Sequence, residues 1–263
     1  MTFSPAQYQA VIDEITSGVT TVESNLAKIK PAAQSATSHW WIDPVTRETL
    51  ILIADKTVEF GTKLLDWIKD LLKGAVAPIY LFADGMTWLD IKGDAAGVAT
   101  DIGAQKIVLG DSGWSGDAAD AYTAAAGRQA AAASRLASIS STTSTTLLSL
   151  AGAGLLFYLA LAAVLAKLIT ATATAIGAFG SAVFSWAGAA IVLEEAGVDT
   201  AAVWAAVGAI TSFLTGQVAA MAALHSETVD PSNFPGGKWP DPTTTAYADG
   251  SIKDGKADWS IKN

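Results

Sequence analysis

The sequence predicts an all-α fold, an elongated helical bundle, and three features support this prediction. Apolar residues recur every three or four positions along most of the chain, which is the spacing of one helix face. Hydrophobic residues make up 51% of the chain but aromatic residues only 8%, and alanine supplies most of the difference. Alanine has the highest helix propensity, and its small side chain allows close helix packing. Glycine and proline cluster in a few predicted turns and in the C-terminal tail.

Two long amphipathic helices are expected at the N-terminus. Residues 5–37 carry apolar side chains in alternating steps of four and three, and Ser4 is the expected N-cap. Residues 44–73 have the same kind of apolar face, with Asp43 before Pro44 as the N-cap. The turn between them contains His39-Trp40-Trp41, which either packs on a neighbouring segment or contacts a partner or a lipid interface.

A glycine-rich turn at residues 110–116 is expected to join two further helices. Apolar spacing of three and four residues runs from Trp88 to Ile102 before the turn and from Tyr122 to Thr143 after it. Glycine adopts backbone angles that other residues avoid, so three glycines in this turn favour a reversal of the chain. Residues 85–146 are therefore predicted to form an antiparallel helical hairpin with Trp114 at its tip.

The centre of this hairpin resembles a known family. Trp114-Ser115-Gly116, followed by Ala118-Ala119 and Tyr122, is similar to the WxG signature of ESAT-like and Esp-like substrates of actinobacterial type VII (ESX) secretion. In that family the motif forms the turn of a helical hairpin. The resemblance implies export as a folded helical protein, with Trp114 and Gly116 recognised by the secretion machinery.

A second short pattern resembles the export signal of the same family. Tyr80 and Asp84 match YxxxD, and the resemblance implies that they also contribute to recognition. In the family this signal lies at the exit of a helix, next to the WxG turn. The alternative is that Tyr80 and Phe82 only anchor a linker, because residues 74–85 contain Pro78 and are expected to form a connector.

Residues 147–226 are predicted to form an apolar helical hairpin rich in alanine and glycine. Residues 147–166 and residues 168–193 each contain no charged side chain, and Lys167 separates the two runs. Each run reaches the ~20 residues that cross a bilayer. Small residues allow close helix contacts, as in membrane helix pairs. Residues 147–193 are either inserted in a membrane or buried by packing and oligomerisation, and the second alternative is preferred. The expected membrane or oligomer contacts are the large apolar side chains Leu155, Phe157, Leu161, Phe179, Phe184 and Trp186.

The C-terminal residues 227–263 are expected to form an irregular arm, because their prolines and glycines exclude regular helix. Trp239 and Trp259 are expected to pin this arm onto the bundle or onto a neighbouring subunit. The predicted organisation therefore has four parts, listed by residue number as 1–84, 85–146, 147–226 and 227–263.

Composition and motifs argue against several classes of function. The net charge of −9 disfavours nucleic-acid binding. Without cysteine, and with His39 and His225 as the only histidines, no disulfide framework, metal site or other cofactor is expected. Gly110-Asp111-Ser112-Gly113 is similar to the nucleophile loop of trypsin-like proteases, but it lies between predicted helices rather than in a β-barrel, so no enzymatic activity is expected. The N-terminus lacks a basic region followed by an apolar run, so no Sec-type signal peptide is expected.

Together these observations predict a non-enzymatic substrate or structural component of a type VII secretion system. It would be secreted or associated with the cell envelope, and would self-assemble there as a homo-oligomer, either a pore or a filament. Its expected partners are the secretion machinery and a helical co-secreted protein or a membrane. The alternative is an integral membrane protein with a soluble helical head and no secretion role.

Overall fold

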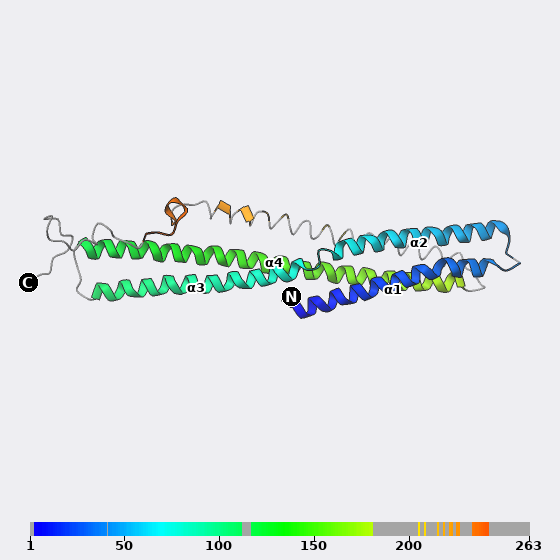
Figure 1. Ribbon diagram of the computed structural model, residues 1–263, viewed down its shortest axis with the longest axis horizontal. Helices are drawn as coiled ribbons and strands as arrows, with labels where there is room; N and C mark the ends of the chain where they lie inside the picture. Colours follow the sequence, from blue (N-terminus) through cyan, green and yellow to red (C-terminus); the bar gives the residue numbers. More distant parts are fainter. Residues whose placement is uncertain are drawn as a thin grey trace, which may run out of the picture. The chain divides into compact units, whose positions relative to one another are not determined.

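The computed structural model describes residues 3–40, 42–111, 117–180 and 233–241, together with eight single helical positions between residues 205 and 226. This part of the chain contains no strand, which confirms the predicted all-α fold. Its elements are α1 (Pro5–Thr37), α2 (Pro44–Leu72), α3 (Ala77–Asp111), α4 (Asp117–Gly180) and the short 3-10 helix η1 (Pro235–Gly237) (Figure 1).

The chain divides into two compact units, and α3 and α4 each run from one unit into the other. Unit 1 contains Met1–Leu81 and Ser149–Thr215, and unit 2 contains Phe82–Leu148 and Gly216–Asn263. Unit 1 therefore combines α1, α2 and the C-terminal half of α4, whereas unit 2 combines most of α3 with the N-terminal half of α4.

The ends of α1 and α2 agree with the sequence predictions. Ser4 precedes α1 as its N-cap, although it is the backbone carbonyl of Ser4, and not its side chain, that accepts a hydrogen bond, from the Tyr8 N–H at 2.9 Å. The carboxylate of Asp43 caps α2 by accepting hydrogen bonds from the backbone N–H groups of Val45 and Thr46, both at 3.0 Å. The hydroxyl and the backbone N–H of Thr46 are the main groups that lower the pKa of this carboxyl.

In unit 1, α1 and α2 pack as an antiparallel pair. Ion pairs join Lys30 to Asp55 at 2.8 Å and Lys69 to Glu23 at 2.6 Å, so residues further along α1 meet residues earlier in α2. These side chains are about half exposed, so the pairs define register more than they add stability. Gly61 allows the helices to approach closely, because a Cβ at this position would lie 2.6 Å from Cδ2 of Leu26.

The C-terminal half of α4 completes the core of unit 1 and runs parallel to α1. The Nδ2 of Asn25 donates to Oγ1 of Thr172 at 3.1 Å, and Gly18 faces Leu165, whose Cδ2 would lie 2.6 Å from an added Cβ. Buried residues recur at steps of three and four on both helices. They include Tyr8, Val11, Ile15, Val19, Val22, Leu26 and Ile29 on α1, and Leu155, Tyr158, Leu161, Leu165, Leu168, Thr172, Ala175 and Phe179 on α4.

The structure corrects the expected connector at residues 74–85. α3 begins at Ala77, so only a short turn separates it from α2. Pro78 lies in the first turn of α3, where the N–H that proline lacks would have no acceptor within the helix. The Pro78 ring packs against α4, where a Cβ added to Gly154 would lie 2.5 Å from its Cγ.

The expected boundary at residues 146 and 147 lies inside α4, which continues without a break from Asp117 to Gly180. The change there from polar to apolar side chains does not interrupt backbone hydrogen bonding, and the glycines that follow cost only about 1 kcal/mol each in a helix interior. Most of the second helix of the expected apolar hairpin, and the C-terminal arm apart from residues 233–241, lie outside the described residues.

Candidate functional site

The hairpin in unit 2 consists of α3 and the N-terminal half of α4, which are antiparallel (Figure 1). The Ser144 hydroxyl of α4 donates to the backbone carbonyl of Gly85 in α3 at 2.7 Å. Gly85 also lies against Leu148, whose Cγ would be 2.9 Å from a Cβ at residue 85. α3 ends at Asp111 and α4 begins at Asp117, so residues 112–116 join the two helices. Trp114 and Gly116 of the WxG motif belong to this joining segment and lie outside the described residues.

The described buried residues of α3 and α4 in unit 2 are all small. They are Gly85, Ala95, Ala119, Ala125, Ala132, Ala133, Ser140, Ser144 and Thr146, and Gly85 and Ser144 belong to the seam between the two helices. The hydroxyl of Ser140 is buried and has no hydrogen-bond partner among the residues that the structure describes. Since side chains of this size bury little apolar surface, the seam depends on close backbone approach for its stability.

Tyr80 and Asp84 are exposed residues of α3, and the Tyr80 side chain is 66% exposed. Of the two residues expected to anchor a linker in the alternative, Tyr80 is exposed and Phe82 is half-buried, and both belong to α3 rather than to a linker. Asp84 lies about 40 Å along α3 from Asp111 at the usual helical rise per residue. This differs from the arrangement that the resemblance implies, in which the signal lies next to the WxG turn.

Two buried tyrosines hold the turn between α2 and α3, and the sequence analysis did not identify this role. The Tyr8 hydroxyl donates to the Ala75 carbonyl at 2.6 Å, and the Tyr158 hydroxyl donates to the Leu71 carbonyl at 2.9 Å. Leu71 belongs to the last turn of α2, whose carbonyls lack partners within the helix. The two rings meet edge to face, with centroids 5.6 Å apart. Burial is the main cause that raises the pKa of both phenols above the ordinary value of 10.0.

The large apolar side chains expected to contact a membrane or other subunits have different environments. Leu155, Leu161 and Phe179 are buried within unit 1, and Phe157 is half-buried. A contact of the three buried side chains with a membrane or a second subunit would require unit 1 to open. The remaining two, Phe184 and Trp186, lie outside the described residues.

The apolar part of α4 nevertheless has an uncovered face. Among the described helices, α4 is the one that is long and apolar enough to cross a membrane, over Ala119–Phe179. Only 28% of its most apolar 18-residue window is buried. Leu156 is 56% exposed and Leu159 37% exposed. The core helix of a water-soluble protein would be mostly covered. The exposed apolar side chains of this face can therefore bind a further apolar surface.

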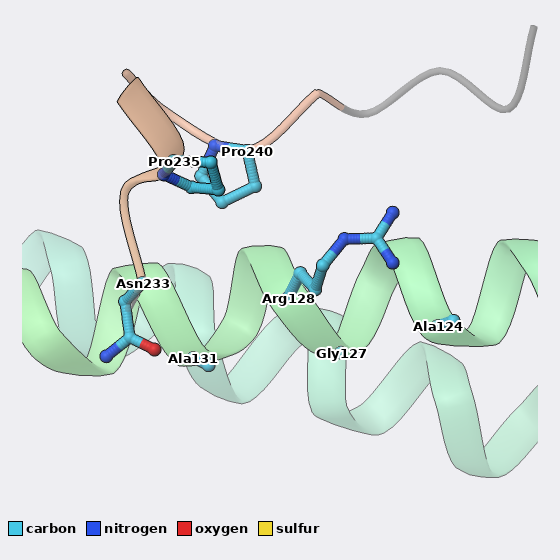
Figure 2. Close-up of a pocket in the computed structure, with 7 residues that line it drawn as sticks. All are labelled: Ala124, Gly127, Arg128, Ala131, Asn233, Pro235 and Pro240. Carbon is cyan, nitrogen blue, oxygen red and sulfur yellow. The ribbon is translucent and has the colours of Figure 1, made fainter. Parts of the chain in front are cut away.

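Unit 2 contains a cavity of about 260 Å³ between α4 and the described part of the C-terminal arm. Its walls are Ala124, Gly127, Arg128 and Ala131 from α4, and Asn233, Pro235 and Pro240 from the arm. Figure 2 shows the two proline rings above the helix and the Arg128 side chain rising beside them. Sequence analysis missed this cavity, because it depends on packing between segments more than 100 residues apart, such as the Gln129–Pro240 contact at a separation of 111.

Comparisons with known proteins do not connect this chain to a relative. No protein-family description, curated protein or solved structure matches it. Within the described ranges no group of three or more histidine, aspartate or glutamate residues is arranged to hold a metal ion.

Proposed function

We propose that this protein is a non-enzymatic substrate or structural component of an actinobacterial type VII secretion system. It is exported as a folded helical protein and acts at the cell envelope. Trp114, Gly116, Tyr80 and Asp84 contribute to its recognition by the secretion machinery.

The observation that carries this proposal is the position of the WxG motif relative to α3 and α4. The motif occupies the short segment between the end of α3 at Asp111 and the start of α4 at Asp117. The two helices are antiparallel, as the Ser144–Gly85 hydrogen bond indicates. This is the helical hairpin context that the family resemblance requires, and it supports the functional assignment of Trp114 and Gly116.

The exposure of Tyr80 and Asp84 supports their part in the proposal. A residue that a partner recognises has to be accessible, and both side chains are exposed on α3. They lie about 40 Å along α3 from the end that leads to the WxG segment, unlike in the family, so their exposure supports their part in recognition and their position does not.

Single substitutions in a host with an active type VII system test this assignment. We expect Trp114→Ala, Tyr80→Ala and Asp84→Ala each to retain the protein in the cell, measured as the fraction of intact chain in the culture filtrate. Trp40→Ala and Asp94→Ala are matched controls at exposed positions and should be exported like the wild type. Export of all three motif variants at the wild-type level would show that the motif assignment is wrong.

We further propose that the exported protein self-assembles through the uncovered face of α4. The exposure of Leu156 and Leu159 supports this proposal, and a second copy would cover them. Light scattering without detergent should give a mass of several chains, and Leu156→Glu should reduce it to that of one chain. A monomeric wild-type protein would contradict this part.

The membrane alternative rests on the same helix, because a bilayer would also cover its apolar window. Flotation of the purified protein with liposomes separates the two possibilities. A soluble assembly that stays at the bottom of the gradient supports self-assembly. Aggregation without detergent together with stable flotation supports the membrane protein instead.

A further inference from the structure

The cavity in unit 2 has a small-residue floor and a rigid roof. Ala124, Gly127 and Ala131 share one face of α4, and none of them extends beyond a methyl group. Nothing lies within 4 Å of a Cβ added at Gly127, so this floor is open. The rings of Pro235 and Pro240 form the opposite wall, as Figure 2 shows.

The described part of the arm holds this roof in a defined shape. Gly236 and Gly237 have φ angles of 64° and 71°, which favour glycine, and the Gly237 N–H donates to the Phe234 carbonyl at 2.9 Å. Pro240 is buried, and its carbonyl accepts a hydrogen bond from Nε2 of Gln129 at 3.5 Å. The turn therefore presents its two proline rings to the cavity without needing a ligand to order them.

Arg128 is the one charged residue among the described residues that line the cavity. Its side chain is exposed, and within the described part of the chain its guanidinium makes no hydrogen bond or ion pair. Asp120 on the same helix and Asp241, which directly follows Pro240, form no ion pair with Arg128 within the described part of the chain. In Figure 2 the guanidinium lies on the Ala124 side of the cavity, at its edge.

We propose that this cavity binds a small monocarboxylate with an apolar ring or short chain. The guanidinium of Arg128 pairs with the carboxylate at the edge, in the fork geometry that arginine offers. The apolar body lies between the small residues of α4 and the proline rings. A cavity of about 150 Å³ accommodates benzene, so one of about 260 Å³ has room for a phenyl group and its carboxylate arm. The net charge of −9 disfavours larger polyanions. This inference does not depend on the proposed role in secretion.

A titration of the full-length protein with phenylacetate, followed by ligand-observed NMR, tests the proposal. We expect saturable binding in the millimolar range, and binding of the neutral analogue 2-phenylethanol at least about tenfold weaker, because a hydrogen-bonded charge pair is lost. Arg128→Gln should weaken phenylacetate binding by a similar factor. Arg47→Gln, at an exposed arginine of α2 outside the cavity, is the matched control and should bind like the wild type.

A second variant tests the apolar part of the site. Gly127→Leu places a side chain in the cavity and should abolish binding of phenylacetate, while circular dichroism reports whether the helical content is kept. The proposal is overturned if phenylacetate does not bind saturably up to about 20 mM, far above the expected range. Equal binding of acid and alcohol, or unchanged binding by the Arg128→Gln variant, also overturns it.

Discussion

A pair of glycines on α4 allows the packing of unit 1 to be tested with an internal control. Gly154 faces Pro78 of α3, whereas nothing lies within 4 Å of a Cβ added at Gly152. Both are half-buried residues of the same helix. Gly154→Ala and Gly152→Ala therefore make the same chemical change two residues apart, and only the first creates a clash.

The magnitude follows from the distances at the two positions. The new methyl group at residue 154 would lie 2.5 Å from Cγ and 3.0 Å from Cβ of Pro78, against about 3.5–4.0 Å for an unstrained contact. The proline ring cannot rotate away, so α4 has to shift, and such overpacking costs about 1–3 kcal/mol. Both variants gain up to about 1 kcal/mol from the higher helix propensity of alanine, and this gain cancels when they are compared with each other.

Thermal unfolding of the two purified variants, side by side, measures this difference. We expect Gly152→Ala to unfold at or above the wild-type temperature, and Gly154→Ala to unfold below Gly152→Ala by about 2–4 °C for each kcal/mol of strain. Equal unfolding temperatures for the two variants would refute the close packing of Pro78 on Gly154, and with it the start of α3 at Ala77.

Two further predictions concern buried hydroxyls. Tyr8→Phe removes the hydrogen bond to the Ala75 carbonyl and should lower stability by about 1–2 kcal/mol at pH 7, measured by urea unfolding. Burial raises the pKa of the Tyr8 phenol in the folded state above its value in the unfolded state. The wild type should therefore lose stability as the pH rises above about 10, and the difference in unfolding free energy between wild type and variant should shrink. A constant difference in unfolding free energy from pH 7 to about 11 would contradict this. Ser144→Ala should destabilise unit 2 by about 1 kcal/mol through the lost bond to Gly85, seen as faster amide exchange in α3. The exposed Ser149→Ala is its control, and equal exchange in both would count against the antiparallel seam.

Local sequence patterns were sufficient to predict α1 and α2. The alternating spacing of apolar residues predicted helices at 5–37 and 44–73, and the structure has Pro5–Thr37 and Pro44–Leu72. Asp43 was identified as a cap because a carboxylate before proline satisfies N–H groups that the first turn leaves free. These features depend on residues close together in the sequence.

The start of α3 and the partner of the apolar half of α4 could not be predicted in this way. Pro78 is equally compatible with a loop and with a first helical turn, and what distinguishes them is its contact with Gly154. The pairing of α4 with α1 depends on contacts such as Asn25–Thr172, at a sequence separation of 147. Periodicity shows which face of a helix is apolar, but it does not identify the helix that covers that face.

In the candidate sites, too, local patterns identified some residues, whereas features that depend on contacts between distant residues were missed. Sequence analysis identified Tyr80 and Asp84 as candidates from their spacing, but their exposure depends on how α3 packs. It did not identify Arg128, because the residues around it become a cavity wall only when the C-terminal arm lies on α4. Four positions spaced as Ala124, Gly127, Arg128 and Ala131 are ordinary in an alanine-rich helix, so no local pattern could have marked them.

Dependence of export on the secretion machinery tests the central claim most directly. The intact chain would be quantified in the culture filtrate of two otherwise identical strains, one with an active type VII system and one lacking its ATPase, with a cytosolic protein as the lysis control. The proposed function predicts intact chain in the filtrate of the first strain and its retention in the cells of the second. Equal amounts in both filtrates, or retention in both strains, would contradict the claim that this protein is a type VII substrate.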